Sequence, residues 1–397
     1  MRRSDRVGVE VFSDRPIAAL AEAVAWIDAA TFRLPGEPVP LGEAAGRVLA
    51  ADCRAEHAMP DRDRAALDGF AVEAQRSVGA SAYNPLAVPA AAVAAGDPLP
   101  AGMDAVVPLA AAEPGGPGNA LLVEPVAPSE NIERQGAVAA PDAILAAAGT
   151  RLAVPHLGLL AAAGIAEVAA VRQPRVAILL AGPVGSQGVP DSNRPMLRAA
   201  VVRDGGIIVA EELVAERSRP ALAATLAVAA SDIALVVGGT GAGTDDHAAA
   251  ALAEAGELAL HGIALRPGET TGLGRSGAGI PVVLLPGAPP ACLWSYELFA
   301  GRAIRRLAGR DPSLPFRHCR MTAARKIVSM VGMTEICPVR FGGAPGTVEP
   351  LPAFAEIGLT AATAGDGFII IPEASEGHPQ GASVIVHLYE DREAETG

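Results

Sequence analysis

The segment from Gly238 to Asp246 has the composition of an anion-binding loop. It reads Gly-Gly-Thr-Gly-Ala-Gly-Thr-Asp-Asp and follows a largely apolar run, 232–237, that has the length of a buried strand. Glycines let backbone N–H groups approach a ligand closely, and the N-terminus of a following helix attracts negative charge. We therefore expect an anion such as phosphate to bind here. The alternative is a flexible loop in which Asp245 or Asp246 caps the next helix.

Two shorter Pro-Gly segments are a second and a third candidate site. Pro286–Gly287 follows an apolar run at 280–285, and Arg266 directly precedes Pro267–Gly268. A guanidinium group binds phosphate or carboxylate oxygens through two parallel hydrogen bonds. Taken singly, both segments are also ordinary, because proline is common in the first turn of a helix and most lone arginines are solvated surface charges.

Histidine and cysteine spacing argues against a metal site built from neighbouring residues. The seven histidines form no His-x-His or His-Glu-x-x-His pattern, and the four cysteines form no Cys-x-x-Cys pair. We expect the cysteines to be small buried side chains in a reduced compartment. Phosphate-binding P-loop and Gly-x-Ser-x-Gly hydrolase sequences are also missing.

Composition narrows the class of protein further. The 397 residues carry a net charge of −13, which argues against a nucleic-acid binder. Half of the residues are hydrophobic and only 3% are aromatic, so the cores must be aliphatic. Apolar runs are interrupted by glycine, proline or charge, and the N-terminus has no apolar stretch of a signal peptide. We expect a soluble cytoplasmic protein that binds neither nucleic acid nor membrane.

The elements around the loops alternate between strand and helix. This alternation predicts a doubly wound, mostly parallel sheet, in which ligands bind at the carboxyl ends of the strands. The expected strands are 175–180, 206–213, 232–237 and 280–285, and the expected helices are 219–229, 246–255, 289–308 and one that begins at Asp191 or Ser192 and ends near 204.

The rest of the chain predicts three further domains. Residues 15–58 and 138–172 form an elongated discontinuous domain with helices near 17–27, at 42–50 and at 154–163. Residues 59–137, rich in proline and glycine, form a small inserted β domain. Residues 173–312 form the α/β domain, and 313–394 form a C-terminal β domain.

One segment resembles a known family motif closely. Residues 63–72 read Asp-Arg-Ala-Ala-Leu-Asp-Gly-Phe-Ala-Val, similar to the Asp-Arg-Ser-Ala-Met-Asp-Gly-Tyr-Ala-Val motif of the molybdopterin molybdenumtransferase (MoeA/gephyrin) family. Weaker similarities occur along the chain in the family's order, which makes the resemblance specific and nearly chain-wide. They lie at 39–50, 95–107, 131–136, 164–168, 191–193 and 366–373.

The resemblance implies both an activity and a site. The family inserts molybdate into adenylylated molybdopterin with release of AMP, as a four-domain homodimer. It implies that Asp68 and Asp246 organise Mg²⁺ or molybdate, that Arg266 holds the phosphate, and that Asp68 of one subunit faces the α/β domain of the other. The cofactor-binding residues implied are Gly238, Gly239, Thr240, Gly241, Gly243, Asp245, Pro267, Gly268, Pro286, Gly287, Ser192 and Asn193.

Several family residues are replaced in this chain. Two carboxylates that the family has after its first strand are Pro183 and Val184 here, and two of its lysines are Gly262 and Glu269. Glu269 places like charge near a bound anion, which opposes binding. Two hypotheses remain. One is an active insertase. The other is a non-catalytic pterin-binding protein that delivers the cofactor to a molybdoenzyme or another cofactor-biosynthesis protein.

Overall fold

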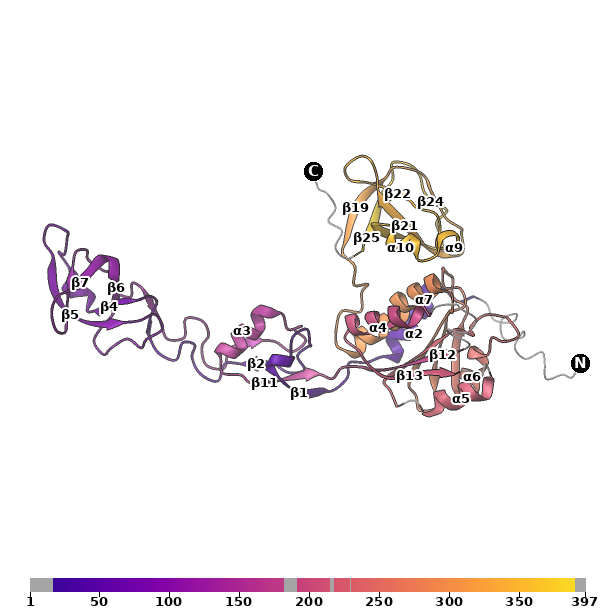
Figure 1. The fold of residues 1–397 in the computed structure, drawn as a ribbon, viewed down its shortest axis with the longest axis horizontal. Coiled ribbons are helices and arrows are strands. Elements are labelled where there is room, and N and C mark those ends of the chain that lie inside the picture. Colours follow the sequence, from indigo (N-terminus) through magenta and orange to yellow (C-terminus); the bar gives the residue numbers. More distant parts are fainter. Residues whose placement is uncertain (1–16, 182–190, 215–217, 229, 390–397) are drawn as a thin grey trace, which may run out of the picture. The chain divides into compact units, whose positions relative to one another are not determined.

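The computed structural model describes residues 17–181, 191–214, 218–228 and 230–389. The chain divides into two compact units, of which the smaller comprises residues 36–170. The larger unit contains helix α2 (Leu20–Ala30), the α/β domain and a C-terminal β domain (Figure 1). The domain boundaries expected from the sequence stay predictions.

A six-stranded mixed sheet forms the centre of the α/β domain. Its order is β13-β12-β14-β18-β17-β15, and the first four strands are parallel. The strands are β12 (Arg175–Ala181), β13 (Ile207–Val214), β14 (Ile233–Val237), β15 (Gly256–His261), β17 (Gly272–Ser276) and β18 (Pro281–Leu285). The predicted doubly wound, mostly parallel sheet is confirmed, with β15 and β17 as an antiparallel extension that the sequence pattern did not indicate.

Helices cover both faces of this sheet (Figure 1). Because side chains alternate along a strand, Ile178 and Leu180 of β12 join one core, whereas Ala177 and Leu179 join the other. Helices α5 (Arg219–Val228) and α6 (Ala248–Ala255) pack on the second core. The first core is covered by α2, α4 (Asn193–Asp204), α7 (Pro289–Ser295), the π-helical turn η6 (Tyr296–Ala300) and α8 (Gly301–Leu307).

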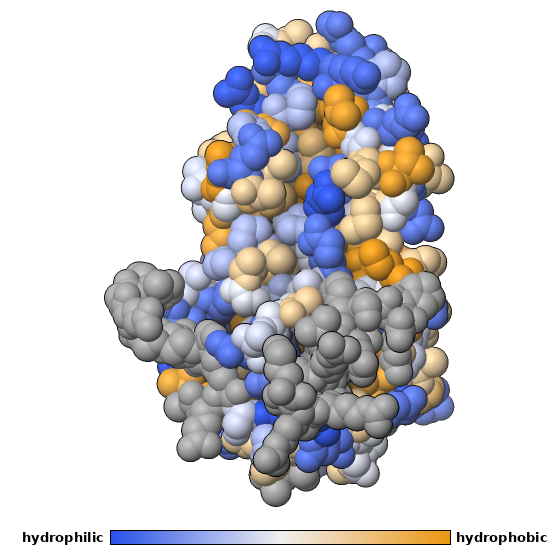
Figure 2. All heavy atoms as spheres, turned by 90° about the vertical axis from the view of Figure 1, so that its right-hand side faces the viewer, coloured by the Kyte–Doolittle hydropathy of each residue, from blue (hydrophilic) through white to orange (hydrophobic). Residues whose placement is uncertain are grey.

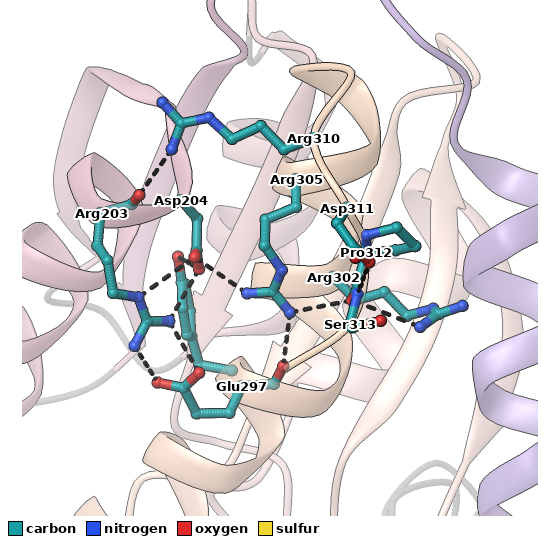
Figure 3. A network of polar contacts seen from close by, with 10 residues as sticks. Arg203, Asp204, Glu297, Arg302, Arg305, Arg310, Asp311, Pro312 and Ser313 are labelled. Carbon is teal, nitrogen blue, oxygen red and sulfur yellow. Dashed lines mark hydrogen bonds and ion pairs between the residues drawn. The ribbon is translucent and has the colours of Figure 1, made fainter. Parts of the chain in front are cut away.

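Buried ion pairs tie α4 to the helix that runs from α7 to α8 (Figure 3). Arg203 contacts Glu297 through two hydrogen bonds of 2.8 Å, and Arg305 lies 3.0 Å from the buried Asp204. Burial raises the pKa of Glu297, while its ion pair with Arg203 opposes the shift. Arg305 also donates to the carbonyl oxygen of Pro312, so the cluster extends to the chain leading into the next domain.

The C-terminal β domain closes on itself as a small barrel. Strands β21, β22, β19, β25 and β23 pair in a ring, and β16 of the α/β domain adds in parallel beside β21. Trp294 of α7 packs against Phe354 and Phe368, with ring centroids 5.7 and 4.4 Å apart, so the two domains share a core. The elements are β16 (Leu265–Arg266), β19 (His318–Ala323), β20 (Ile327–Val328), β21 (Thr334–Phe341), β22 (Thr347–Pro350), α9 (Phe354–Ile357), α10 (Thr360–Thr363), β23 (Gly367–Ile371), β24 (Gly377–His378) and β25 (Ser383–Leu388).

The smaller unit holds an antiparallel five-stranded sheet, in the order β6-β4-β5-β8-β7. Its strands are β4 (Gly69–Val72), β5 (Leu86–Val93), β6 (Ala105–Pro108), β7 (Ala112–Pro114) and β8 (Asn119–Leu122). A separate part contains α3 (Val154–Ala162) and two strand pairs, β1 (Gly36–Pro40) with β11 (Glu167–Val171) and β2 (Cys53–Arg54) with β10 (Ile144–Ala146). Short strands β3 (Arg64–Ala65) and β9 (Ile132–Glu133) pair with each other.

The helix expected at 42–50 does not form. A short 3₁₀ turn at Leu41–Glu43 takes its place. Gly46 has a φ of +72°, which a right-handed helix cannot include, and Val48 and Leu49 form bridges with Arg151 and Ala170. Pairing with distant backbone therefore overrides the helical pattern of this segment.

The surface is mixed in character. On the face of the larger unit in Figure 2, hydrophobic and hydrophilic residues are interspersed, and no continuous apolar area is visible where the described atoms are exposed. In the described part of the chain, every helix is too short or too polar to span a bilayer.

Candidate functional site

The carboxyl ends of three parallel strands bring two of the predicted loops together. Leu180, Val237 and Leu285 are in register on β12, β14 and β18. The N–H of Gly238 donates to the carbonyl oxygen of Leu285 (2.9 Å). A side chain at Gly238 would lie 2.9 Å from the carbonyl oxygen of Ala181, and its φ is +85°, so only glycine fits. Gly287 also approaches closely, since its Cβ would lie 3.4 Å from Gly238 Cα.

Asp246 stabilises the glycine loop from inside. Its Oδ2 accepts the N–H of Gly243 (2.9 Å), and a Cβ on Gly241 would lie only 2.5 Å from the same oxygen. Helix α6 begins after His247, without a side-chain cap. The alternative in which Asp245 or Asp246 caps this helix is therefore wrong. Asp246 instead closes the loop, while Asp245 lies exposed in the turn before it.

Hydroxyl groups connect the glycine loop to the segment after Arg266. The Oγ1 atoms of Thr240 and Thr270 are 2.9 Å apart. The Nε2 atom of His261 donates to the carbonyl oxygen of the buried Thr240 (3.0 Å). Thr271 donates to the carbonyl oxygen of Gly268 (2.6 Å). The loops at 238–246 and 266–271 thus form one connected surface.

The start of α4 contributes a further contact. The side-chain amide of Asn193 donates to the carbonyl oxygen of Gly287 (2.8 Å). Of the two expected capping residues, Asp191 accepts the N–H of Arg194 at 3.0 Å, whereas Ser192 makes no capping hydrogen bond. The segment before Asp191, including the replaced positions Pro183 and Val184, lies outside the described residues.

Arg266 is paired with Glu269. Its Nε lies 3.3 Å from Oε1 of Glu269, and Oε2 of Glu269 accepts the N–H of Gly268 (3.0 Å). Both side chains line a cleft of about 610 Å³ between the α/β and C-terminal domains, together with Pro267, Ala288, Pro290, Ala291, Glu335, Ile336, Ala353, Phe354, Ala355, Glu356 and Gly358. Three carboxylates and one guanidinium face this cleft, which makes it less favourable for anions than the family motif implies.

The donor set for a divalent cation is small. Within the described residues, no group of three or more carboxylate, histidine or cysteine side chains is placed to hold a metal ion. Mg²⁺ commonly takes only one or two protein carboxylates and completes its shell with water and substrate phosphates. Asp246, at the carboxyl edge of the sheet, fits such a partial role.

Asp68 lies in the smaller unit, in the turn before β4. Its Oδ1 accepts the N–H of Ala95 (2.7 Å), and the side chain is exposed. Gly69 after it cannot carry a side chain, because a Cβ would lie 2.1 Å from the carbonyl oxygen of Val107. The segment that resembles the family motif is therefore a tightly packed turn that presents Asp68. Its position opposite the α/β domain of a partner subunit stays a prediction.

Sequence reasoning missed several residues around the cleft and the loops. Thr270 and Thr271 directly follow Arg-Pro-Gly-Glu, so a search extended by two residues would have included them. Glu335 and Phe354 have no local signal. They reach the cleft because β16 pairs with β21, with Arg266 in register with Glu335.

Family models match most of the chain. Residues 18–164 match the model described as MoeA N-terminal region (domain I and II), and residues 174–306 match that of a probable molybdopterin binding domain. The fold and the carboxyl edge of the sheet thus define a multidomain protein with an α/β domain of the molybdopterin-binding type.

Proteins of similar sequence identify the family to which the chain belongs. The chain is 31% identical over 371 residues to molybdopterin molybdenumtransferase 2 of Mycobacterium tuberculosis, covering 84% of this chain and 90% of the relative. It therefore belongs to the MoeA family of molybdopterin molybdenumtransferases. The enzyme of that name from Bacillus subtilis is 29% identical, with 68% and 70% covered. A crystal structure of the molybdopterin biosynthesis MoeA protein from Pyrococcus horikosii superimposes with a TM-score of 0.77, at 27% identity, covering 94% of this chain and 99% of that one.

Proposed function

We propose that this protein acts in molybdenum cofactor biosynthesis by inserting molybdate into adenylylated molybdopterin, with release of AMP. The observation that carries the proposal is the meeting of Gly238, Gly287 and Asn193 at one edge of the sheet in a member of this family. Glycine loops at such edges suit pyrophosphate groups, because backbone N–H donors need no side-chain charge.

The proposed site residues fall into three groups with different roles. The loop from Gly238 to Gly243, which includes Thr240, surrounds the pyrophosphate together with Asp245. Arg266 supplies positive charge for the phosphate or the incoming oxyanion, since a guanidinium keeps its charge at all physiological pH values. Pro267–Gly268, Pro286–Gly287, Ser192 and Asn193 shape the walls of the site.

A divalent cation is part of the proposal. Asp246 would supply one carboxylate to Mg²⁺, and Asp68 of a partner subunit would supply a second. When bound, the cation would neutralise charge on the phosphate oxygens. The chain's own contribution is to hold the Asp246 carboxylate rigidly, through the N–H of Gly243.

Assembly and location complete the proposal. We propose a homodimer, because the family resemblance implies a site to which Asp68 of one subunit and Asp246 of the other both contribute. A cytoplasmic location and transfer of the product to a molybdoenzyme or another cofactor-biosynthesis protein are proposed on the same basis.

The test is AMP release by the purified protein. Adenylylated molybdopterin is supplied with Mg²⁺, and AMP is quantified with molybdate, with sulfate in its place, and with neither anion. Release that depends on molybdate supports the proposed insertion. Nucleotide-pterin that binds without release would instead identify a carrier, and a protein that does not bind it would contradict both hypotheses.

A further inference from the structure

The carboxylate of Glu269 uses two hydrogen-bond donors of the segment 266–268. Oε1 lies 3.3 Å from Nε of Arg266, and Oε2 accepts the N–H of Gly268 at 3.0 Å. A guanidinium N–H and a backbone N–H thus converge on the two oxygens of one anionic group. Donors arranged in this way also suit two oxygens of a tetrahedral oxyanion such as phosphate or molybdate.

Other contacts fix the backbone of the segment 266–268 in place without the Glu269 side chain. Gly268 has a φ of +135°, and a Cβ there would lie 2.8 Å from the side chain of Leu265, so its backbone is closely packed. Its carbonyl oxygen accepts the hydroxyl of Thr271, which lies 2.6 Å from Oγ of the buried Ser295. Arg266 belongs to β16 and pairs with β21. Removing the Glu269 side chain should therefore leave the N–H of Gly268 and the backbone of Arg266 where they are, and free the guanidinium for another anion.

The contact between Glu269 and Arg266 is exposed enough for another anion to replace the carboxylate. The two side chains are 45% and 38% exposed and line the same cleft. Ion pairs this exposed contribute little to stability, because water screens them and the side chains lose freedom when they pair. An incoming anion can therefore displace the carboxylate, although the displacement weakens its binding.

We propose that Glu269 is an intramolecular competitor for the oxyanion site: its carboxylate occupies Arg266 and Gly268 and must be displaced before an oxyanion binds there. Glu269 is thereby a specificity-determining residue that weakens anion binding and favours anions with more charge than a carboxylate, because Arg266 attracts these more strongly. This inference rests on the proposed function in one respect: it requires that the site binds an oxyanion.

The experiment measures oxyanion affinity without any pterin. Molybdate and AMP are titrated by calorimetry into the wild type, Glu269→Gln and Glu269→Ala at one ionic strength. We expect Kd for both anions to fall about tenfold in Glu269→Ala, the change for one charge-assisted hydrogen bond regained. Glu269→Gln removes the charge with almost no change of shape. Its Kd values are compared with those of the wild type if the alanine variant folds poorly.

A matched control distinguishes competition by the Glu269 carboxylate from an effect of net charge in the cleft. Glu356→Gln makes the same charge change in the same cleft, and Glu356 contacts neither donor in the described structure. We expect its Kd values to stay within about twofold of the wild type. We also expect Arg266→Gln to abolish the gain when combined with Glu269→Ala, because the released donor is then missing.

Two results would overturn the proposal. Equal tightening in Glu356→Gln would show that only net charge matters, and unchanged affinity in both Glu269 variants would show that the carboxylate does not compete. Neither result depends on insertion activity. AMP release can fail while the Glu269 variants bind molybdate more tightly, so the failure of one proposal does not imply that of the other.

Discussion

At the scale of single residues, Asp246 has a structural role that its sequence position did not reveal. The pattern Gly-Thr-Asp-Asp before a helix suggested a cap, but the carboxylate folds back onto Gly243 and packs against Gly241. Glycine at these positions therefore leaves space for the Asp246 side chain, and the N–H of Gly243 is donated to that carboxylate. Any charge role of Asp246 must be separated from this structural one.

Two substitutions of Asp246 make that separation. Asn keeps an oxygen that accepts the N–H of Gly243, whereas Ala removes it. If the charge acts on the substrate, Asp246→Asn should lower AMP release on the order of tenfold or more, with an unchanged thermal midpoint. Asp246→Ala should lower both AMP release and the thermal midpoint. AMP release near the wild-type rate in Asp246→Asn would assign the residue to loop structure alone.

At the scale of elements, helix α2 is tied to α8 by an ion pair between distant segments. Arg302 contacts Asp28 through two hydrogen bonds of 2.7 Å, and Arg306 lies 3.4 Å from the same carboxylate. The hydrogen bond from Arg302 lowers the pKa of Asp28 below its usual 3.8, although burial opposes the shift. The pair supplements the apolar contacts of Ala23 and Ile27 with the same core.

The pKa of Asp28 predicts a pH dependence. Because its folded-state pKa lies below the unfolded value, the pair stabilises the native state above about pH 4, and this is lost as pH falls through the folded-state pKa. Asp28→Asn should cost about 1 kcal/mol at pH 7, since both side chains are partly exposed, and almost nothing in strong acid.

Urea unfolding between pH 2.5 and 7 measures this dependence. Glu22→Gln removes a carboxylate from the exposed first turn of the same helix and serves as the control, with a stability curve expected to follow the wild type. The ion pair would have no role in stability if Asp28→Asn matched the wild type at pH 7.

At the scale of the whole molecule, the proposed site requires two chains. Asp68 belongs to the smaller unit and Asp246 to the larger one. The proposed site would bring them together across two subunits. A homodimer would therefore be a condition for activity and not merely a state of assembly. Light scattering should give a mass of twice 40.0 kDa.

Mixing two inactive variants tests the shared site. Asp68→Ala and Asp246→Ala are each expected to release little AMP. If they are unfolded and refolded together, half of the dimers are mixed and each has one intact site of two, so activity should recover to about a quarter of the wild type. Recovery is not expected when either variant is refolded alone. A mixture as inactive as its components would place both residues in the site of one chain, or outside it.

The sequence by itself determined the alternation of strands and helices, the glycine loop, the Pro-Gly turns and the family. The elements and turns depend on local periodicity and on backbone conformations that glycine favours, so they can be read from neighbouring residues. The family was indicated by the resemblance of residues 63–72, and of weaker motifs along the chain, to family motifs. Tertiary structure alone decided that Val48 and Leu49 pair with distant backbone and do not continue a helix. It also decided that Glu269 turns back onto Arg266 and Gly268, and that Glu335 and Phe354 reach the same cleft. The reason is physical: these contacts join segments far apart in the chain or depend on side-chain direction, and neither leaves a periodic signal in the sequence.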